Sequence, residues 1–214
     1  MTCQLALLLA GWLAWCGLHS LCVSHSVLCQ ARDLLGARFA WYRVGYVVTS
    51  TVTLLPLLLY QASLEQRVLW QWQGLWHLLQ ALLVLHTLAM ALGGARAYRL
   101  EQILGLEQIR RARQGEGETT AALQTGGILR HVRHPWYSGG LSFLWAFGPV
   151  TDVSLAVRCL LSAYLLLGTL LEERKLLREF GAGYRQYRAR TPAFFPWRLL
   201  WRRLPHRISS ETVR

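Results

Sequence analysis

The chain has 214 residues, 53% of them hydrophobic and ten of them tryptophan, and its formal net charge is +12. Apolar runs recur at the length of about 20 residues that a helix needs to cross the hydrocarbon core of a bilayer, which excludes an ordinary soluble domain. The basic residues lie between these runs, where the positive-inside rule explains them more simply than nucleic-acid binding does. We therefore expect membrane lipids, and no nucleic acid, as partners.

Three apolar segments in the first 93 residues predict the N-terminal transmembrane helices. They cover residues 5–28, 44–59 and 75–92. The first segment has no basic residue before it and no small-residue cleavage site after it. We therefore interpret it as a retained helix and not as a signal peptide.

The second half of the chain predicts a helical hairpin followed by a surface helix. A long polar segment, residues 94–134, precedes two apolar segments at 141–150 and 153–171, which only two residues separate. Beyond them, large apolar side chains recur at helical spacing among basic ones over residues 176–187. That pattern is typical of an amphipathic helix lying at a membrane surface.

The predicted fold class is all-α: a polytopic integral membrane protein with about five transmembrane helices, a helical hairpin and a cytoplasmic amphipathic C-terminal helix. We expect a single domain over residues 1–214. Its N-terminal spans occupy residues 1–93, the region with the hairpin occupies 94–190, and a basic tail occupies 191–214.

The distribution of Lys and Arg predicts the orientation in the membrane. If every apolar segment crosses, 21 of the 23 basic residues fall on one face. The opposite face holds Arg67, and Arg158 lies just inside the last span. Because short basic loops stay in the cytoplasm, the N-terminus is expected outside and the C-terminus inside.

A basic turn and an acidic pair stand at the two ends of the hairpin. Arg133 and His134 precede Pro135, which lacks a backbone donor and disfavours helical geometry at the residue before it, so the helix is expected to start near Trp136. Glu172-Glu173 follows the second apolar segment. If both segments cross, the two ends return to the same cytoplasmic face, where cationic groups opposite carboxylates suit a small zwitterion.

These residues resemble the isoprenylcysteine carboxyl methyltransferase superfamily, which also includes membrane phospholipid N-methyltransferases. The resemblance covers about the last half of the chain and rests on Arg133-His134-Pro135, Tyr137, Gly139, Glu172-Glu173, Phe180-Gly181, Tyr184 and Tyr187. Earlier motifs resemble its NnrU-like branch, which includes membrane methanethiol S-methyltransferases. They are His19-Ser20, Tyr42-Arg43, Tyr46, Gly105-Leu106-Glu107-Gln108 and residues 138–145.

The resemblance implies S-adenosylmethionine as the methyl donor, bound at the cytoplasmic face by the region 94–190. Arg133 and His134 can meet its carboxylate, and Glu172 or Glu173 can meet its ammonium group or a ribose hydroxyl. Tyr137 can hydrogen-bond to the adenine or stack on it. The resemblance also includes Pro135, Gly139 and Gln108 in the methyl-donor site.

The expected activity is S-adenosylmethionine-dependent methylation of a small or lipophilic acceptor, a small thiol such as methanethiol being the first choice. Carboxyl methylation of a prenylated cysteine and N-methylation of a phospholipid amine stay open. So does a non-enzymatic membrane partner or transport-related protein that uses the intramembrane histidines. Binding of the methyl donor discriminates this last class from the enzymes.

Ionisable residues inside apolar segments are candidates for the acceptor side. Intramembrane histidines are functional candidates by default, and His19 is the candidate catalytic residue because the resemblance includes it. A packing role for His19, as a neutral ring hydrogen-bonded to a neighbouring helix, stays open. His25 and His86 are interpreted as neutral packing residues that hydrogen-bond to neighbouring helices. No Cys or His spacing predicts a metal site. The basic residues Arg110, Arg111 and Arg113 are expected to form an interfacial face.

Overall fold

The computed structural model describes residues 2–98, 100–115 and 122–197, and in these residues the fold is helical apart from one short pair of strands. The elements in order are α1 (Thr2–Cys22), α2 (His25–Leu35), η1 (Gly36–Trp41), α3 (Tyr42–Ser63), β1 (Val68–Trp70), α4 (Trp76–Ala97), α5 (Leu100–Leu104), α6 (Leu106–Arg113), η2 (Gly127–Arg130), α7 (Pro135–Ala146), β2 (Val150–Thr151) and α8 (Asp152–Arg190). The all-α expectation is confirmed.

Within the described residues, four stretches are long and apolar enough to cross a membrane: Thr2–Cys22, His25–Ser63, Trp76–Ala97 and Asp152–Arg190. The expected first span, residues 5–28, is wrong at its end. The Ser24 hydroxyl donates to Leu21 O and the backbone turns there, so α1 ends at Cys22 and residues 25–28 belong to α2.

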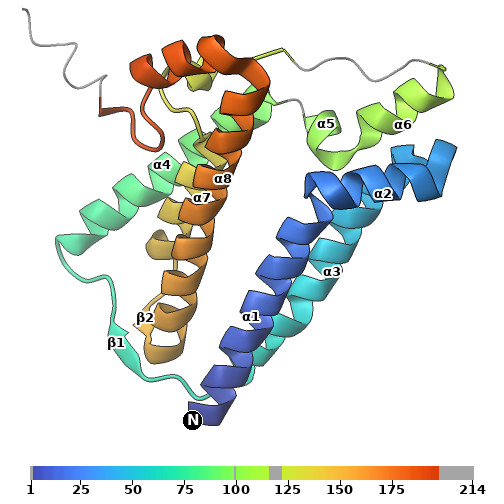
Figure 1. Ribbon diagram of the computed structural model, residues 1–214. Coiled ribbons are helices and arrows are strands. Elements are labelled where there is room, and N and C mark those ends of the chain that lie inside the picture. The colour runs from blue at the N-terminus through green and yellow to red at the C-terminus, as the bar shows by residue number, and fades with distance from the viewer. Residues whose placement is uncertain (1, 99, 116–121, 198–214) are drawn as a thin grey trace, which may run out of the picture.

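α7 and α8 form the hairpin (Figure 1), in which a short helix followed by non-helical chain returns as one long helix. α7 has 12 residues, about 18 Å at the helical rise, whereas the part of α8 that returns to Glu173 is about 33 Å long. The turn before α7 lies beside Glu173, so residues 147–151 cover the remaining distance as non-helical chain. Pro149 cannot donate a helical hydrogen bond, which explains why the helix is not resumed there.

The loop after α3 is joined to the tip of the hairpin by β1 and β2. The strands are antiparallel, with Val68 opposite Thr151 and Trp70 opposite Val150. The backbone N–H of Arg67 also donates to Asp152 Oδ1, at 3.1 Å. The sequence does not predict this pairing, because three residues of strand carry no periodicity of their own. The pairing places these two links, which carry few basic residues, side by side.

Helices α1 and α3 run side by side, and α4, α7 and α8 form a second group (Figure 1). A core of Leu8 and Trp12 from α1 with Val153 and Val157 from α8 joins the two groups near the hairpin tip. The expected surface helix after the acidic pair is a continuation of α8, which bends at Gly181, where φ is +53°.

Arg158 stabilises the non-helical arm of the hairpin. Its Nη2 donates to Phe147 O at 2.8 Å and to Pro149 O at 2.9 Å, and the side chain is buried. Carbonyl groups outside helices need such donors where water is absent. Arg158→Met is expected to lower the free energy of unfolding by about 1.5–3 kcal/mol, measured by SDS-induced unfolding in mixed micelles. Arg178→Met, an exposed change on the same helix, is the control, and equal stability of the two variants would contradict this role.

Candidate active site

The turn before α7 is held in a non-helical conformation by contacts at both sides. His134 has φ −123° and ψ 69°, and Pro135 occupies the first turn of α7, as the sequence predicted. The backbone N–H of Arg133 donates to Pro192 O at 2.9 Å, and that of His134 donates to Ala193 O at 3.1 Å. The chain that leaves α8 therefore lies across the turn. The described part of the tail thus covers the candidate site, and residues 198–214 lie outside the described residues.

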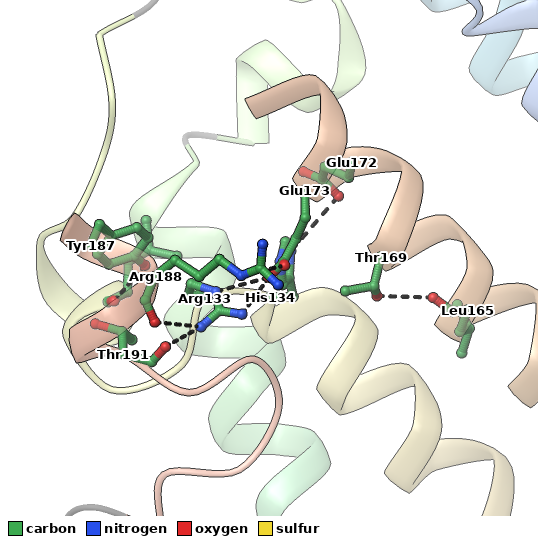
Figure 2. Close-up of polar contacts among 10 residues, drawn as sticks. Arg133, His134, Leu165, Thr169, Glu172, Glu173, Tyr187, Arg188 and Thr191 are labelled. Atoms are coloured by element: carbon green, nitrogen blue, oxygen red, sulfur yellow. Dashed lines mark hydrogen bonds and ion pairs between the residues drawn. The ribbon is translucent and has the colours of Figure 1, made fainter. Parts of the chain in front are cut away.

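Arg133 and Glu173 form a buried ion pair at the centre of the site (Figure 2). Arg133 Nε donates to Glu173 Oε1 at 3.0 Å, and Nη2 donates to the same oxygen. The remaining Nη1 donates to the carbonyl oxygens of Arg188 and Thr191. The Arg133 and Glu173 side chains are only 9% and 8% exposed. The sequence motif therefore brings these two charges into direct contact, with the guanidinium already bonded to the protein's own oxygens.

His134 completes this buried cluster. Its Nε2 lies 3.2 Å from Glu173 Oε1, and its Nδ1 lies 3.8 Å from Glu172 Oε2. Burial lowers the pKa of His134 below its ordinary value, although both carboxylates act in the opposite direction. The ring is thus neutral near pH 7. It can donate one N–H to Glu173 while its other nitrogen faces Glu172.

Glu172 is the accessible carboxylate of the pair, with a side chain 39% exposed. The Tyr137 hydroxyl lies within electrostatic range of it. Burial, followed by the charges of Glu172 and Tyr184, raises the pKa of Tyr98 to about 12, so Tyr98 also lies within electrostatic range of Glu172. Tyr98 was not predicted from the sequence, since a single Tyr after α4 carries no motif. Glu172 can hydrogen-bond to a cationic or hydroxyl-bearing ligand, with Tyr98 and Tyr137 within electrostatic range of the carboxylate.

Tyr137 connects this carboxylate to the N-terminal helices. Its ring packs against α8 at Gly168, where an added Cβ would lie 3.1 Å from Tyr137 Cε1. Tyr164 of α8 and Tyr46 of α3 both lie within electrostatic range of Tyr137. The site at the Arg-His-Pro turn therefore continues toward α1 and α3.

His19 lies in an aromatic cluster at the end of that connection. The Tyr46 hydroxyl is 2.7 Å from His19 Nε2, and Trp15 stacks on the His19 ring at a centroid distance of 5.0 Å. The Tyr164 ring meets His19 edge-on at 6.5 Å, and the Tyr164 hydroxyl lies 3.0 Å from Ser20 Oγ. His19 was predicted from the sequence, whereas Trp15 and Tyr164 were not, because their apolar neighbours are typical of ordinary span residues.

Two other predicted site residues lie elsewhere. Gly139 faces α4, where an added Cβ would come within 3.0 Å of Met90 Cβ, so its small size permits the close packing of α4 and α7. Gln108 lies on α6, which packs against η1 and α5, and its Nε2 donates to Gln102 O at 3.5 Å. Figure 1 shows α6 above α2, well away from α7 and α8. The structure does not bring Gln108 to the other candidate residues.

His86 has the packing role that the sequence suggested. Its Nδ1 lies 2.8 Å from Ser142 Oγ and its Nε2 lies 3.3 Å from Ser138 Oγ, both on α7. The Ser138 hydroxyl also donates to Phe194 O, and the Phe195 ring lies 5.0 Å from that of His86. These contacts fasten the chain after α8 onto α4 and α7.

Comparison with known proteins gives consistent matches over most of the chain. The family model described as NnrU protein matches residues 7–193. The chain is 32% identical to methanethiol S-methyltransferase 2 of Bradyrhizobium diazoefficiens, over 89% of its own length and 75% of that protein's. It is 30% identical to the methanethiol S-methyltransferase of Mycobacterium tuberculosis, over 77% of its own length and 65% of the relative's.

A third relative, the methanethiol S-methyltransferase of Pseudomonas deceptionensis, is 29% identical over 72% of this chain and 59% of its own length. The chain therefore spans three quarters of the first of these relatives and less than two thirds of the other two. No solved structure matches it significantly.

Proposed function

Because this chain belongs to the NnrU family, we propose that it is an integral membrane methyltransferase that transfers a methyl group from S-adenosylmethionine to a small thiol. The observation that carries the proposal is the similarity over most of the chain to proteins named methanethiol S-methyltransferase. The arrangement of the candidate site supports it, since an accessible carboxylate and an intramembrane histidine are connected through Tyr137.

The residues around Glu172 fit the methyl donor. Glu172 can accept from the ammonium group or a ribose hydroxyl, and Tyr98 and Tyr137, which lie within electrostatic range of it, offer hydroxyl groups and ring faces to the rest of the methyl donor. Arg133 and His134 belong to the same site. They contact Glu173 and fix the conformation of the turn that the methyl donor would contact. Pro135 and Gly139 contribute through the shape of the turn and the packing of α7.

His19 is proposed as the group that receives the acceptor's proton. When bound, S-adenosylmethionine supplies a methyl group on a sulfonium, which a thiolate takes by direct displacement. A cysteine-like thiol has a pKa of about 8.5, so a base near the sulfur increases the reactive fraction at neutral pH. Tyr46, which hydrogen-bonds to His19, orients the ring, and the aromatic cluster with Trp15 and Tyr164 excludes water.

Exchanging Glu172 for glutamine is expected to weaken binding of S-adenosylhomocysteine by about 10- to 150-fold. A charge-assisted hydrogen bond contributes roughly 1.5–3 kcal/mol, and the amide keeps the shape but loses the charge. Calorimetric titration of detergent-solubilised protein measures the change. Glu179→Gln, an exposed carboxylate further along α8, is the control. If a folded Glu172→Gln variant binds S-adenosylhomocysteine with unchanged affinity, Glu172 does not contact the methyl donor.

The membrane topology is proposed with α7 and the non-helical residues 147–151 as a fifth crossing, the N-terminus outside, and the candidate site and C-terminus in the cytoplasm. Reporter fusions after Arg113 and after Arg190 should give cytoplasmic signals, and a fusion within residues 61–73 should give an external one. The reason is the retention of basic loops in the cytoplasm. A cytoplasmic signal from residues 61–73 would contradict the five-crossing arrangement.

The activity is tested by methyl transfer from labelled S-adenosylmethionine in membranes that contain the protein. Methanethiol and other small thiols, prenylated cysteines and phospholipid amines form the acceptor panel, and membranes without the protein are the control. We expect label in the small thiols. Transfer only to a prenylated cysteine or a lipid would replace the thiol as the proposed acceptor. If the folded protein binds no S-adenosylhomocysteine, the proposed methyltransferase activity is wrong.

A further inference from the structure

A groove of about 510 Å³ lies between α6 and the start of α3, apart from the candidate active site. Its lining includes Trp41, Val44, Leu106, Ile109, Arg110 and Arg113. We call it the α6 groove. None of these residues belongs to the buried cluster of Arg133, His134 and Glu173 or to the aromatic cluster around His19.

One face of α6 forms a wall of the α6 groove. Leu106, Ile109, Arg110 and Arg113 follow the spacing i, i+3, i+4 and i+7, which puts them on the same side of the helix. The wall is apolar at its beginning and basic at its end.

The close approach of α6 to α3 is built into the turn before α6. Gly105 has φ +85°, a conformation that favours glycine, and an added Cβ would lie 2.9 Å from Arg43 Cβ and 3.0 Å from Val44 N. Arg43 Nε also donates to Ile103 O at 2.9 Å, which ties α3 to the chain before this turn. The groove therefore has a defined position relative to the first turn of a candidate membrane span.

The α6 groove combines exposed apolar surface with available positive charge. Trp41 and Leu106 are 52% and 50% exposed although both are large and apolar. Arg110 is 3.5 Å from Glu101, but both side chains are more than half exposed, and such surface pairs are weak. An anion can therefore compete for the Arg110 guanidinium at little cost.

We propose that the α6 groove binds an anionic phospholipid, with its phosphate at Arg110 and Arg113 and an acyl chain along Trp41, Val44 and Leu106. Val44 lies in the first turn of α3, so the groove opens at the height where the apolar part of a span begins and lipid headgroups are found. Guanidinium groups bind phosphate by paired hydrogen bonds. The apolar lining favours a lipid over a soluble phosphate, and the two arginines favour a net negative headgroup over a zwitterionic one.

The test is lipid titration of the full-length, delipidated protein in detergent, followed by native mass spectrometry. Dioleoyl phosphatidylglycerol and dioleoyl phosphatidylcholine have the same acyl chains, so they compare headgroups alone. We expect the wild type to prefer phosphatidylglycerol. The double variant Arg110→Gln/Arg113→Gln should bind it about 30-fold more weakly, since each arginine near a lipid phosphate contributes about a factor of five.

Arg178→Gln/Arg185→Gln removes the same charge from exposed positions on α8 and should bind phosphatidylglycerol as the wild type does. Leu106→Ser should weaken binding of both lipids, because it reduces the apolar surface of the groove. Equal binding of the two lipids by the wild type, equal losses in the two double variants, or displacement of the lipid by glycerol phosphate would each overturn the proposal. The proposed methyl transfer does not depend on it, so either can fail alone.

Discussion

Alanine in place of Arg133 is expected to lower the free energy of unfolding by about 3–5 kcal/mol, which is the size of effect seen when one partner of a buried ion pair is removed. The loss removes the buried counter-charge of Glu173 and leaves the half-exposed Arg188, whose Nε lies 3.1 Å from Glu173 Oε2. The carbonyl groups of Arg188 and Thr191 also lose a donor. SDS-induced unfolding in mixed micelles measures the change.

Two further variants separate the ion pair from a general effect of charge. Arg130→Ala removes an exposed arginine from η2, three residues earlier, and should leave stability nearly unchanged. Arg133→Lys should recover only part of the loss, because an ammonium group cannot donate to Glu173 and to two carbonyl groups in the geometry of the guanidinium. If Arg133→Ala unfolds as the wild type does but loses affinity for S-adenosylhomocysteine, then Arg133 binds the methyl donor directly and its contact with Glu173 is secondary.

Alanine in place of His19 is expected to lower kcat for thiol methylation by about 10²- to 10⁴-fold, the range of positioned acid–base groups, with affinity for S-adenosylhomocysteine nearly unchanged. The loss should shrink as the pH rises toward the pKa of the thiol, since the acceptor then ionises without a base. Methyl transfer from labelled S-adenosylmethionine, measured from pH 6 to pH 9, shows both effects.

His25→Ala is the matched control for this prediction. His25 lies on α2 at an exposed position, where it contacts Cys29 and no residue of the aromatic cluster around His19. Tyr46→Phe should give an intermediate loss in kcat with the same pH trend, because the ring stays in place while the hydrogen bond to His19 is removed. A loss in His19→Ala that is independent of pH, or that only follows a lower thermal stability, would indicate a packing role.

The features that the sequence predicted correctly depend on neighbouring residues. The length and hydropathy of an apolar run are local properties, so the helical class and the long apolar segments could be read directly. Pro135 restricts the residue before it through sterics alone, and the structure has α7 start at that proline. The order of the turn, the hairpin and Glu172-Glu173 along the chain was enough to predict that Arg133, His134 and both carboxylates lie together.

Only the tertiary structure decided which of these groups pair with one another and which stay accessible. It pairs Arg133 with Glu173, leaves Glu172 accessible, brings Tyr98 within electrostatic range of Glu172 and places Gln108 on a distant helix. It also forms β1 and β2 from segments too short to show a period, and joins His19 to Tyr164 across α1 and α8. These contacts join residues far apart in the chain. Which of them form depends on how closely the helices can pack, as at Gly139 and Gly168, and that distance is set by many side chains together.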